Sequence, residues 1–248
     1  MKRKIIINPQ YQELEEFITS IPNILEEEGT VLQNRRNLIK IINHKGLSLN
    51  IKRFRKPIFI NRIIYSFFRK TKAKRAYDNA IEVIKRGFDT PYPIAYIIDK
   101  SKGLLNYSYF ISIQVQNVYE IRDHYLTKPE TNESLFKAFA QYSAKLHEAG
   151  ILHQDYSPGN VLISKLDRKY KFTLVDINRM KFKKIDIKEG CENFSRLFGP
   201  DETYEYIAKE YAIYRNFDVN ECIKLALKYK HSFERKKLRK KRLKSLFK

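Results

Sequence analysis

A short segment beyond the middle of the chain combines the residue types that phosphoryl transfer requires. It contains Asp155 and, five residues later, Asn160, and Asp176 follows after two short apolar runs. We expect Asp155 to orient and deprotonate an acceptor hydroxyl, because a loop carboxylate can act as a general base. Asn160 and Asp176 are the candidate metal ligands, since amide and carboxylate oxygens suit Mg²⁺. The pattern therefore predicts phosphoryl transfer with ATP and Mg²⁺ as cofactors.

The elements around this segment predict how it is held. Apolar residues on one broad face predict a helix that begins near residues 132–134 and ends at Gly150. Apolar runs at 161–163 and 172–175 predict two short strands. The Pro158-Gly159 pair allows a sharp turn, so the side chains of the loop can reach one cleft.

The first half of the chain predicts a small antiparallel sheet with one helix. The runs that read as strands are 31–33, 38–43, 47–52, 94–98 and 107–115. In the third run apolar and polar residues alternate, so Lys52 should point away from the apolar face of the sheet. Between the third and fourth runs, apolar residues at helical spacing predict a helix that ends at Gly87.

The set formed by Lys52, His153, Asp155, Asn160 and Asp176 resembles the protein-kinase-like superfamily, whose catalytic loop reads H-x-D-x-x-x-x-N. The resemblance implies that Lys52 binds the ATP phosphates and that His153 braces the loop. It also implies a two-lobed α+β fold, with an N-terminal antiparallel sheet carrying one helix and a mainly helical C-terminal lobe.

The same resemblance implies how the chain is divided. We expect one kinase-like domain over residues 1–248, with an N-lobe at about 1–116, a C-lobe at 117–227 and a basic tail at 228–248. The segment from Gln114 to Asn117 is expected to form the hinge that hydrogen-bonds adenine through its backbone. Gln114 and Gln116 are therefore candidate ATP-binding residues.

Departures from the protein-kinase pattern narrow the family. Ser157 stands where protein kinases usually have a lysine, two residues after the catalytic Asp. Residues 176–179 read Asp-Ile-Asn-Arg instead of Asp-Phe-Gly, and no Ala-Pro-Glu motif follows. These features favour a small-molecule or lipid-linked acceptor over a peptide. The sequence has no glycine-rich loop near its first strands. The candidates to replace the helix glutamate that pairs with the strand lysine are Asp78, Asn79 and Glu82.

Further segments sharpen the resemblance to one family. These are Arg36-Asn37 and residues 51–57, 72–77, 87–91 and 176–180. Together they look like the lipopolysaccharide kinase family, which phosphorylates Kdo or heptose in the inner core next to lipid A. The resemblance covers roughly residues 28–200 and implies a lipopolysaccharide or lipid A-core glycolipid as the acceptor.

Composition indicates an anionic partner. The chain has 248 residues, with 49 Lys and Arg against 28 Asp and Glu, which gives a net charge of +21. Basic segments at 52–75 and 228–248 are expected to contact an anionic membrane surface, and no stable protein partner is evident. The two cysteines exclude a disulfide framework. The apolar runs are too short to span a membrane, so we expect a cytoplasmic protein that is peripheral on the inner membrane.

Other functions remain open on the sequence alone. A RIO-like protein kinase or an aminoglycoside- or choline-type phosphotransferase shares the loop with Ser and Pro. A pseudokinase is a further alternative. An RNA-binding module would use the positive charge together with Tyr and Phe for stacking. That last interpretation leaves the set of Asp155, Asn160 and Asp176 unexplained, so nucleic acid is not the expected partner.

Overall fold

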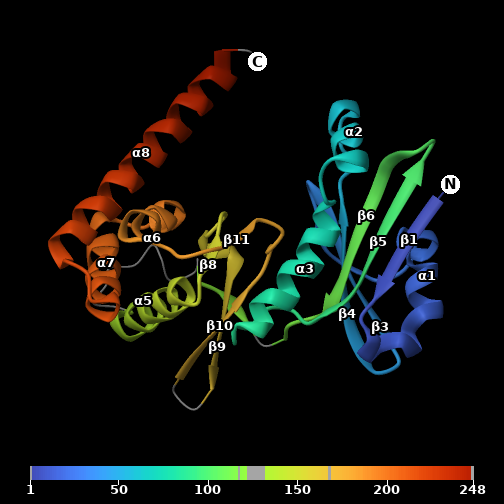
Figure 1. The fold of residues 1–248 in the computed structure, drawn as a ribbon, viewed down its shortest axis with the longest axis horizontal. Coiled ribbons are helices and arrows are strands. Elements are labelled where there is room, and N and C mark those ends of the chain that lie inside the picture. Colours follow the sequence, from blue (N-terminus) through green and yellow to red (C-terminus); the bar gives the residue numbers. More distant parts are fainter. Residues whose placement is uncertain (1, 117, 122–131, 167–168, 247–248) are drawn as a thin grey trace. The chain divides into compact units, whose positions relative to one another are not determined.

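The chain forms two compact units, residues 1–116 and 117–248, which are considered separately (Figure 1). The computed structural model describes residues 2–116, 118–121, 132–166 and 169–246. Each unit has its own buried apolar core.

Unit 1 is built on a six-stranded antiparallel sheet with the order β1-β5-β6-β4-β3-β2. Its strands are β1 (Lys2–Ile7), β2 (Thr30–Asn34), β3 (Asn37–His44), β4 (Leu47–Phe54), β5 (Pro93–Ser101) and β6 (Leu104–Ile113). The five predicted strands are confirmed as β2 to β6. Strand β1 was not predicted, because its apolar run is short and its pairing partner β5 lies far along the chain.

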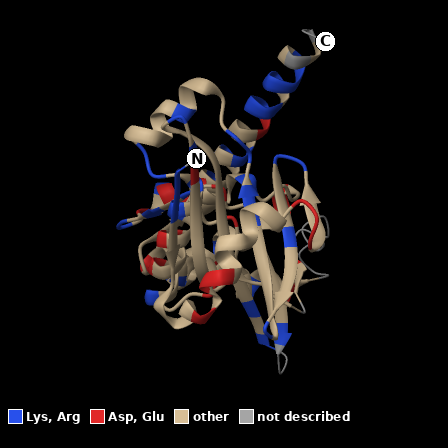
Figure 2. Ribbon diagram, turned by 90° about the vertical axis from the view of Figure 1, so that its right-hand side faces the viewer, with Lys and Arg blue, Asp and Glu red and all other residues tan. Residues whose placement is uncertain are grey.

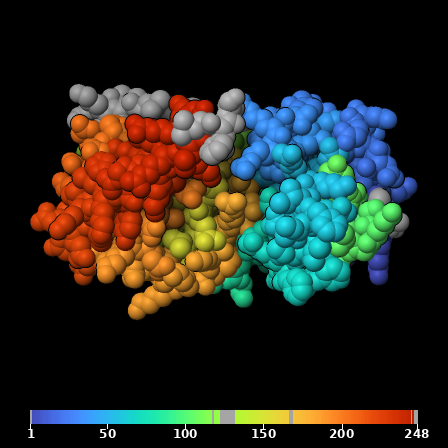
Figure 3. Space-filling model, turned by 90° about the horizontal axis from the view of Figure 1, so that it is seen from above, coloured from blue at the N-terminus to red at the C-terminus, as the bar shows by residue number. Residues whose placement is uncertain are grey.

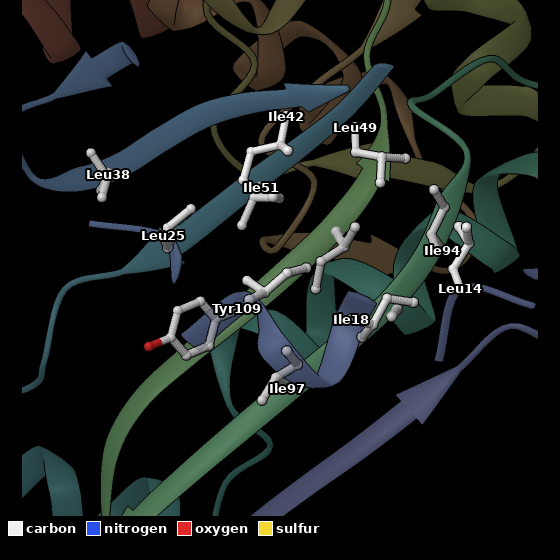
Figure 4. Close-up of a cluster of buried hydrophobic side chains, with 13 residues drawn as sticks. Leu14, Ile18, Leu25, Leu38, Ile42, Leu49, Ile51, Ile94, Ile97 and Tyr109 are labelled. Carbon is white, nitrogen blue, oxygen red and sulfur yellow. The ribbon is translucent and has the colours of Figure 1, made fainter. Parts of the chain in front are cut away.

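One face of the sheet is covered by the helical segment η1 (Pro9–Leu14) and helix α1 (Glu15–Ile24). Ile18 of α1 belongs to one buried cluster with Leu49 and Ile51 of β4 (Figure 4). Ile21 of α1 is also fully buried in this cluster. Burial of this apolar surface is the main force that holds α1 on the sheet.

The other face of the sheet carries helix α3 (Lys72–Lys85), which packs against β5 and β6. The helix begins at Thr71, whose side chain accepts a hydrogen bond from the backbone NH of Lys74. Its Tyr77 ring contacts the Tyr96 ring of β5 at a centroid distance of 5.3 Å. This is the predicted helix before Gly87. A second helix, α2 (Phe59–Phe67), lies between β4 and α3 and was not predicted.

Unit 2 is mainly helical and contains two small sheets, with strand orders β10-β9-β7 and β11-β8. Its strands are β7 (Tyr119–Glu120), β8 (Ile151–His153), β9 (Val161–Leu166), β10 (Lys169–Leu174) and β11 (Met180–Phe182). Its helices are α5 (Glu133–Glu148), η3 (Pro158–Asn160), α6 (Ile187–Asn193), η4 (Phe194–Arg196), α7 (Asp201–Arg215) and α8 (Val219–Leu246). Helix α5 packs on α7, and α7 packs on α8. The predicted helix ending at Gly150 is confirmed as α5.

Helix α8 contains most of the segment expected to be a basic tail. It runs without interruption from residue 219 through 228 to 246, so residue 228 is not the start of a separate element. From residue 235 to 243 every side chain is exposed, and Figure 2 shows Lys and Arg dominating this end of the helix. In the described part of the chain, no helix is both long and apolar enough to cross a membrane.

Candidate active site

His153 ties the predicted catalytic loop to the segment that carries Asp176. Its side chain is fully buried, and its Nε2 lies 3.1 Å from the carbonyl oxygen of Val175. Its Nδ1 accepts a hydrogen bond of 3.1 Å from the backbone NH of Asp155. Burial lowers the pKa of His153, which favours the neutral ring. This pair of contacts assigns the proton to Nε2, because Nδ1 acts as the acceptor.

The loop itself is closed by Asn160. The side-chain nitrogen of Asn160 donates to the backbone carbonyl of Asp155 at 2.8 Å, and its backbone NH donates to the carbonyl of Ser157 at 2.8 Å. Its own carbonyl accepts from the backbone NH of Val175 at 3.0 Å. Asn160 is therefore linked to the residue before Asp176. Because the side-chain nitrogen of Asn160 bonds the loop, its side-chain oxygen is the candidate ligand for a cation.

Asp176 adopts an unusual backbone conformation. Its φ is +54°, in the left-handed region that non-glycine residues rarely occupy at a cost on the order of 1 kcal/mol or more. The side chain of Asn178 donates a hydrogen bond of 2.7 Å to Asp176 Oδ1 and thereby supports this turn. Such strain is found at sites where a side chain must be aimed in one direction.

Two arginines lie beside the carboxylate of Asp155. Arg196 Nη1 donates to Asp155 Oδ1 at 2.8 Å, and Arg179 Nη1 lies 3.9 Å from Asp155 Oδ2. The sequence analysis assigned neither of them a role. Arg179 is part of the Asp-Ile-Asn-Arg segment at 176–179, so a role near the site could have been predicted from the sequence. Arg196 lies in η4, 41 residues after Asp155, and only the packing of that segment reveals it.

Arg196 also contacts helix α8. Its guanidinium carbon lies 5.1 Å from the centre of the Phe233 ring, a cation–π arrangement. The middle of helix α8 is thus in contact with a residue that binds the predicted catalytic carboxylate. The backbone of His153 is held by the last residue of α6, because the Asn193 side chain donates to its carbonyl at 2.9 Å.

Lys52 lies in β4 of unit 1, on the side of the sheet that carries α3. It is paired in register with Phe110, which is paired in turn with Tyr96, and laterally paired residues share one face. Tyr96 contacts α3 through Tyr77, whereas the preceding residue of β4, Ile51, is buried on the α1 side. Lys52 is half-buried, with Nζ 5.4 Å from the centre of the Phe54 ring.

Two of the three candidates to replace the helix glutamate are engaged within their own part of the chain. Asp78 pairs with Lys70 at 2.9 Å and with Lys74 at 3.1 Å. Glu82 pairs with Arg86, one helical turn later, at 2.7 Å. These ion pairs stabilise α3 locally.

The predicted hinge follows strand β6. The side chain of Gln114 accepts from Asn50 at 2.7 Å and donates to the carbonyl of Val115 at 2.8 Å, while Gln116 is exposed. Asn117 lies outside the described residues. The structure thus brings His153, Asp155, Asn160 and the segment of Asp176 together in unit 2. It places Lys52, Gln114 and Gln116 in unit 1.

The donor set of unit 2 suits Mg²⁺. Among the described residues, no cluster of three or more His, Cys, Asp or Glu could hold a metal ion by itself. Mg²⁺ does not require such a cluster, since it commonly takes one or two protein oxygens together with nucleotide phosphates and water. Asn160 and Asp176 offer two hard oxygen ligands of this kind.

Comparison with known proteins identifies the family. The profile of the lipopolysaccharide kinase (Kdo/WaaP) family matches residues 25–210. The chain belongs to this family. The predicted resemblance is confirmed, and the match covers both β4 with Lys52 and the loop with Asp155.

A curated relative supports the assignment. The chain is 27% identical over 118 residues to a 3-deoxy-D-manno-octulosonic acid kinase of Vibrio parahaemolyticus serotype O3:K6. This match covers 48% of the chain and 48% of the relative, so it spans about half the length of that protein.

A solved structure shows the fold. The chain is similar to WaaP, determined in complex with acyl carrier protein, with a TM-score of 0.64 and 12% identity. The match covers 94% of this chain and 97% of that chain. The predicted kinase-like α+β class is therefore confirmed.

Proposed function

We propose that this chain is an ATP-dependent kinase that phosphorylates a hydroxyl of Kdo or heptose in the inner core of lipopolysaccharide or a lipid A precursor. The observation that carries the proposal is the loop of unit 2, in which Asp155, Asn160 and Asp176 are held by part-buried hydrogen bonds in a member of the lipopolysaccharide kinase family. The 3-deoxy-D-manno-octulosonic acid kinase relative favours Kdo as the first acceptor to test.

Asp155 acts as the general base in this proposal. Its carboxylate accepts the proton of the acceptor hydroxyl while the oxygen forms a bond to the γ-phosphorus. The bond between that phosphorus and the oxygen bridging it to the β-phosphate breaks, and ADP leaves. Asn160 and Asp176 would hold Mg²⁺ through their side-chain oxygens, and the ion would supply positive charge next to the phosphate oxygens. The His153 contacts support a bracing role, since they fix the backbone on both sides of the loop.

Arg179 and Arg196 orient the Asp155 carboxylate. Both arginines follow Asp176 in the sequence and lie beside Asp155. They supply positive charge near this carboxylate, in a loop that has Ser157 instead of the usual lysine. We expect them to hold the base in one rotamer and to attract an anionic acceptor. Lys52 binds the ATP phosphates, and the segment of Gln114 and Gln116 contacts the adenine.

The location of the acceptor sets the proposed location of the enzyme. A kinase for a lipid-linked sugar would act at the cytoplasmic side of the inner membrane. The basic segments 52–75 and 228–248 supply attraction to anionic headgroups, with each exposed Lys or Arg near the surface contributing about 1 kcal/mol. The chain would thus be cytoplasmic and peripheral on that membrane.

The WaaP structure suggests one protein partner to test. Because WaaP was determined in complex with acyl carrier protein, a similar complex is the specific alternative to the expectation of no stable protein partner. Gel filtration of the purified chain with acyl carrier protein would distinguish the two. Co-elution would overturn the expectation.

Transfer of labelled γ-phosphate from Mg-ATP to a purified lipid A-core extract tests the proposed activity. Asp155→Ala and Asp176→Ala proteins should lose the label that the native chain transfers. Glu192→Gln, an exposed acid on α6, serves as the control of equal charge change and should keep it. Absence of label in glycolipid, protein and free sugar, with folded protein that binds ATP, would overturn the proposal.

A further inference from the structure

Helix α2 (Phe59–Phe67) exposes its apolar side chains instead of burying them. None of its residues is buried, and Ile60 and Phe67 are each 67% exposed. The exposed apolar residues in and beside the helix are Ile58, Phe59, Ile60, Ile64, Phe67 and Phe68. Ile60, Ile64 and Phe67 are spaced so that they form one stripe. In Figure 3, α2 is the cyan group of atoms at the surface of unit 1.

The opposite side of α2 is attached to unit 1 through polar contacts. Arg62 Nε donates to the carbonyl of Leu105 at 2.7 Å, and the Ser66 hydroxyl accepts from the backbone NH of Leu105 at 2.8 Å. Lys100 donates to the Ser66 carbonyl at 3.2 Å. A helix of a soluble domain normally turns its apolar stripe toward the core. Here the polar side holds the helix on the start of β6, and the apolar stripe faces outward.

The surroundings of the stripe are strongly basic. Residues 52–75 contain ten Lys and Arg and no Asp or Glu, and Arg55, Lys56 and Arg69 are exposed. Lys100 Nζ lies 5.9 Å from the centre of the Phe67 ring, so a cation also stands beside the stripe itself. An exposed apolar patch with a rim of one charge sign marks an interaction surface.

We propose that α2 inserts this stripe into the interfacial layer of an anionic lipid membrane, with the surrounding Lys and Arg side chains on the lipid phosphates. This inference rests on the proposed function, because a lipid-linked acceptor would bring the chain to a membrane. A helix with an apolar face and a basic rim lies in the plane of such an interface. A protein partner would need a groove shaped for the helix, whereas a fluid bilayer requires only exposed apolar side chains next to cations.

A tryptophan reporter gives a direct test, because the chain contains no tryptophan. Phe67→Trp places a single indole in the stripe, and Tyr214→Trp on α7 places one at a site in unit 2 that is 39% exposed and lies outside both basic segments. Each full-length protein is mixed with vesicles of phosphatidylcholine and phosphatidylglycerol in equal amounts. We expect a blue shift of the emission for Phe67→Trp and no shift for Tyr214→Trp. Equal shifts, or none at Phe67, would overturn the proposal.

Cosedimentation with the same vesicles tests the apolar contribution. Ile60→Ser/Phe67→Ser should lower the ratio of bound to free protein on the order of tenfold or more, because two apolar side chains no longer leave water. The control Ile81→Ser/Ile213→Ser removes two exposed apolar side chains elsewhere and should bind as the native chain does. A purely electrostatic contact would instead leave both double variants equal and would disappear at high salt.

Activity on a soluble acceptor separates this inference from the proposed function. Ile60→Ser/Phe67→Ser should retain native phosphorylation of a deacylated core oligosaccharide while losing vesicle binding. Vesicle binding by the native chain without any kinase activity would overturn the proposed function and leave the surface assignment standing. Binding of the stripe to an acidic carrier protein, with no blue shift on vesicles, would overturn the membrane assignment.

Discussion

The predicted catalytic loop of unit 2 and helix α2 of unit 1 differ in which side chains contact the protein and which contact solvent. In the loop, a buried polar side chain fixes the backbone: His153 is fully buried, and its two ring nitrogens contact the backbone of Asp155 and of Val175. In α2, the polar residues Arg62 and Ser66 form the attachment, and the apolar residues meet solvent. Substitutions in the loop should therefore affect catalysis or folding, whereas substitutions of the exposed apolar residues of α2 should affect only membrane binding.

The largest effect is expected at Asp155, the proposed general base. Asp155→Asn keeps the size of the side chain and can still accept a hydrogen bond from Arg196, but it cannot take the proton of the acceptor. We expect kcat to fall by about 10²–10⁴-fold with the fold intact. Steady-state kinetics with Mg-ATP and circular dichroism check the two halves of this statement. A variant with kcat within a few-fold of native would remove Asp155 from the role of base.

A pair of phenylalanines tests the contrast in burial. Phe139 is fully buried on α5, where its ring stacks on Tyr156 at a centroid distance of 5.6 Å, whereas Phe67 on α2 is 67% exposed. Phe139→Ala should lower the free energy of unfolding by about 3–5 kcal/mol, and Phe67→Ala should change it by about 0.5 kcal/mol or less. Urea unfolding of both proteins measures the difference. Equal effects would mean that α2 is packed in a way the structure does not show.

The sequence was informative where one segment carries its own pattern. The apolar face that ends at Gly150, the spacing of Asp155 and Asn160 with the turn at Pro158, and the strand alternation around Lys52 are local features. They predicted α5, the loop and β4, respectively. Two features that depend on contacts between distant parts of the chain could not be predicted from the sequence. Strand β1 depends on pairing with β5, more than 80 residues away. Arg196 reaches Asp155 only because the fold brings η4 within hydrogen-bond distance of the loop.

Helix α2 escaped prediction for a different physical reason. Its apolar residues have helical spacing, but the segment is short, basic on both sides and without a side-chain hydrogen bond at its N-cap. Sequence periodicity also cannot say which side of a helix faces the protein. Only the contacts of Arg62 and Ser66 with Leu105 show that the polar side is the attached one.

The buried histidines of unit 2 predict a loss of stability in mild acid. His147 on α5 is 1% exposed, its Nδ1 lies 3.0 Å from the Tyr211 hydroxyl, and burial together with the Arg215 charge lowers its pKa to about 4. Between pH 4 and 6.5 the unfolded chain therefore binds more protons than the folded one, and stability falls as the pH falls. The full loss from this group is about 3 kcal/mol.

Urea unfolding as a function of pH checks this expectation. His147→Gln should be less stable than the native chain at pH 7, because it loses the buried contact with Tyr211, and its curve should approach the native one toward pH 4. Parallel curves for the two proteins would contradict the assignment. His153, whose pKa burial also lowers, contributes in the same direction and remains in both proteins.

The smallest effect in this series is expected at Arg196, and it sharpens the comparison most. Arg196→Lys keeps a positive charge near Asp155 but loses the planar group that bonds the carboxylate and lies over the Phe233 ring. We expect kcat to fall by about tenfold, in line with a loss of orientation, with the KM for ATP unchanged. Phe233→Leu should give a weaker effect of the same kind, because it removes only the cation–π contact. A rise in the acceptor KM alone would show that Arg196 binds the acceptor and does not orient the base.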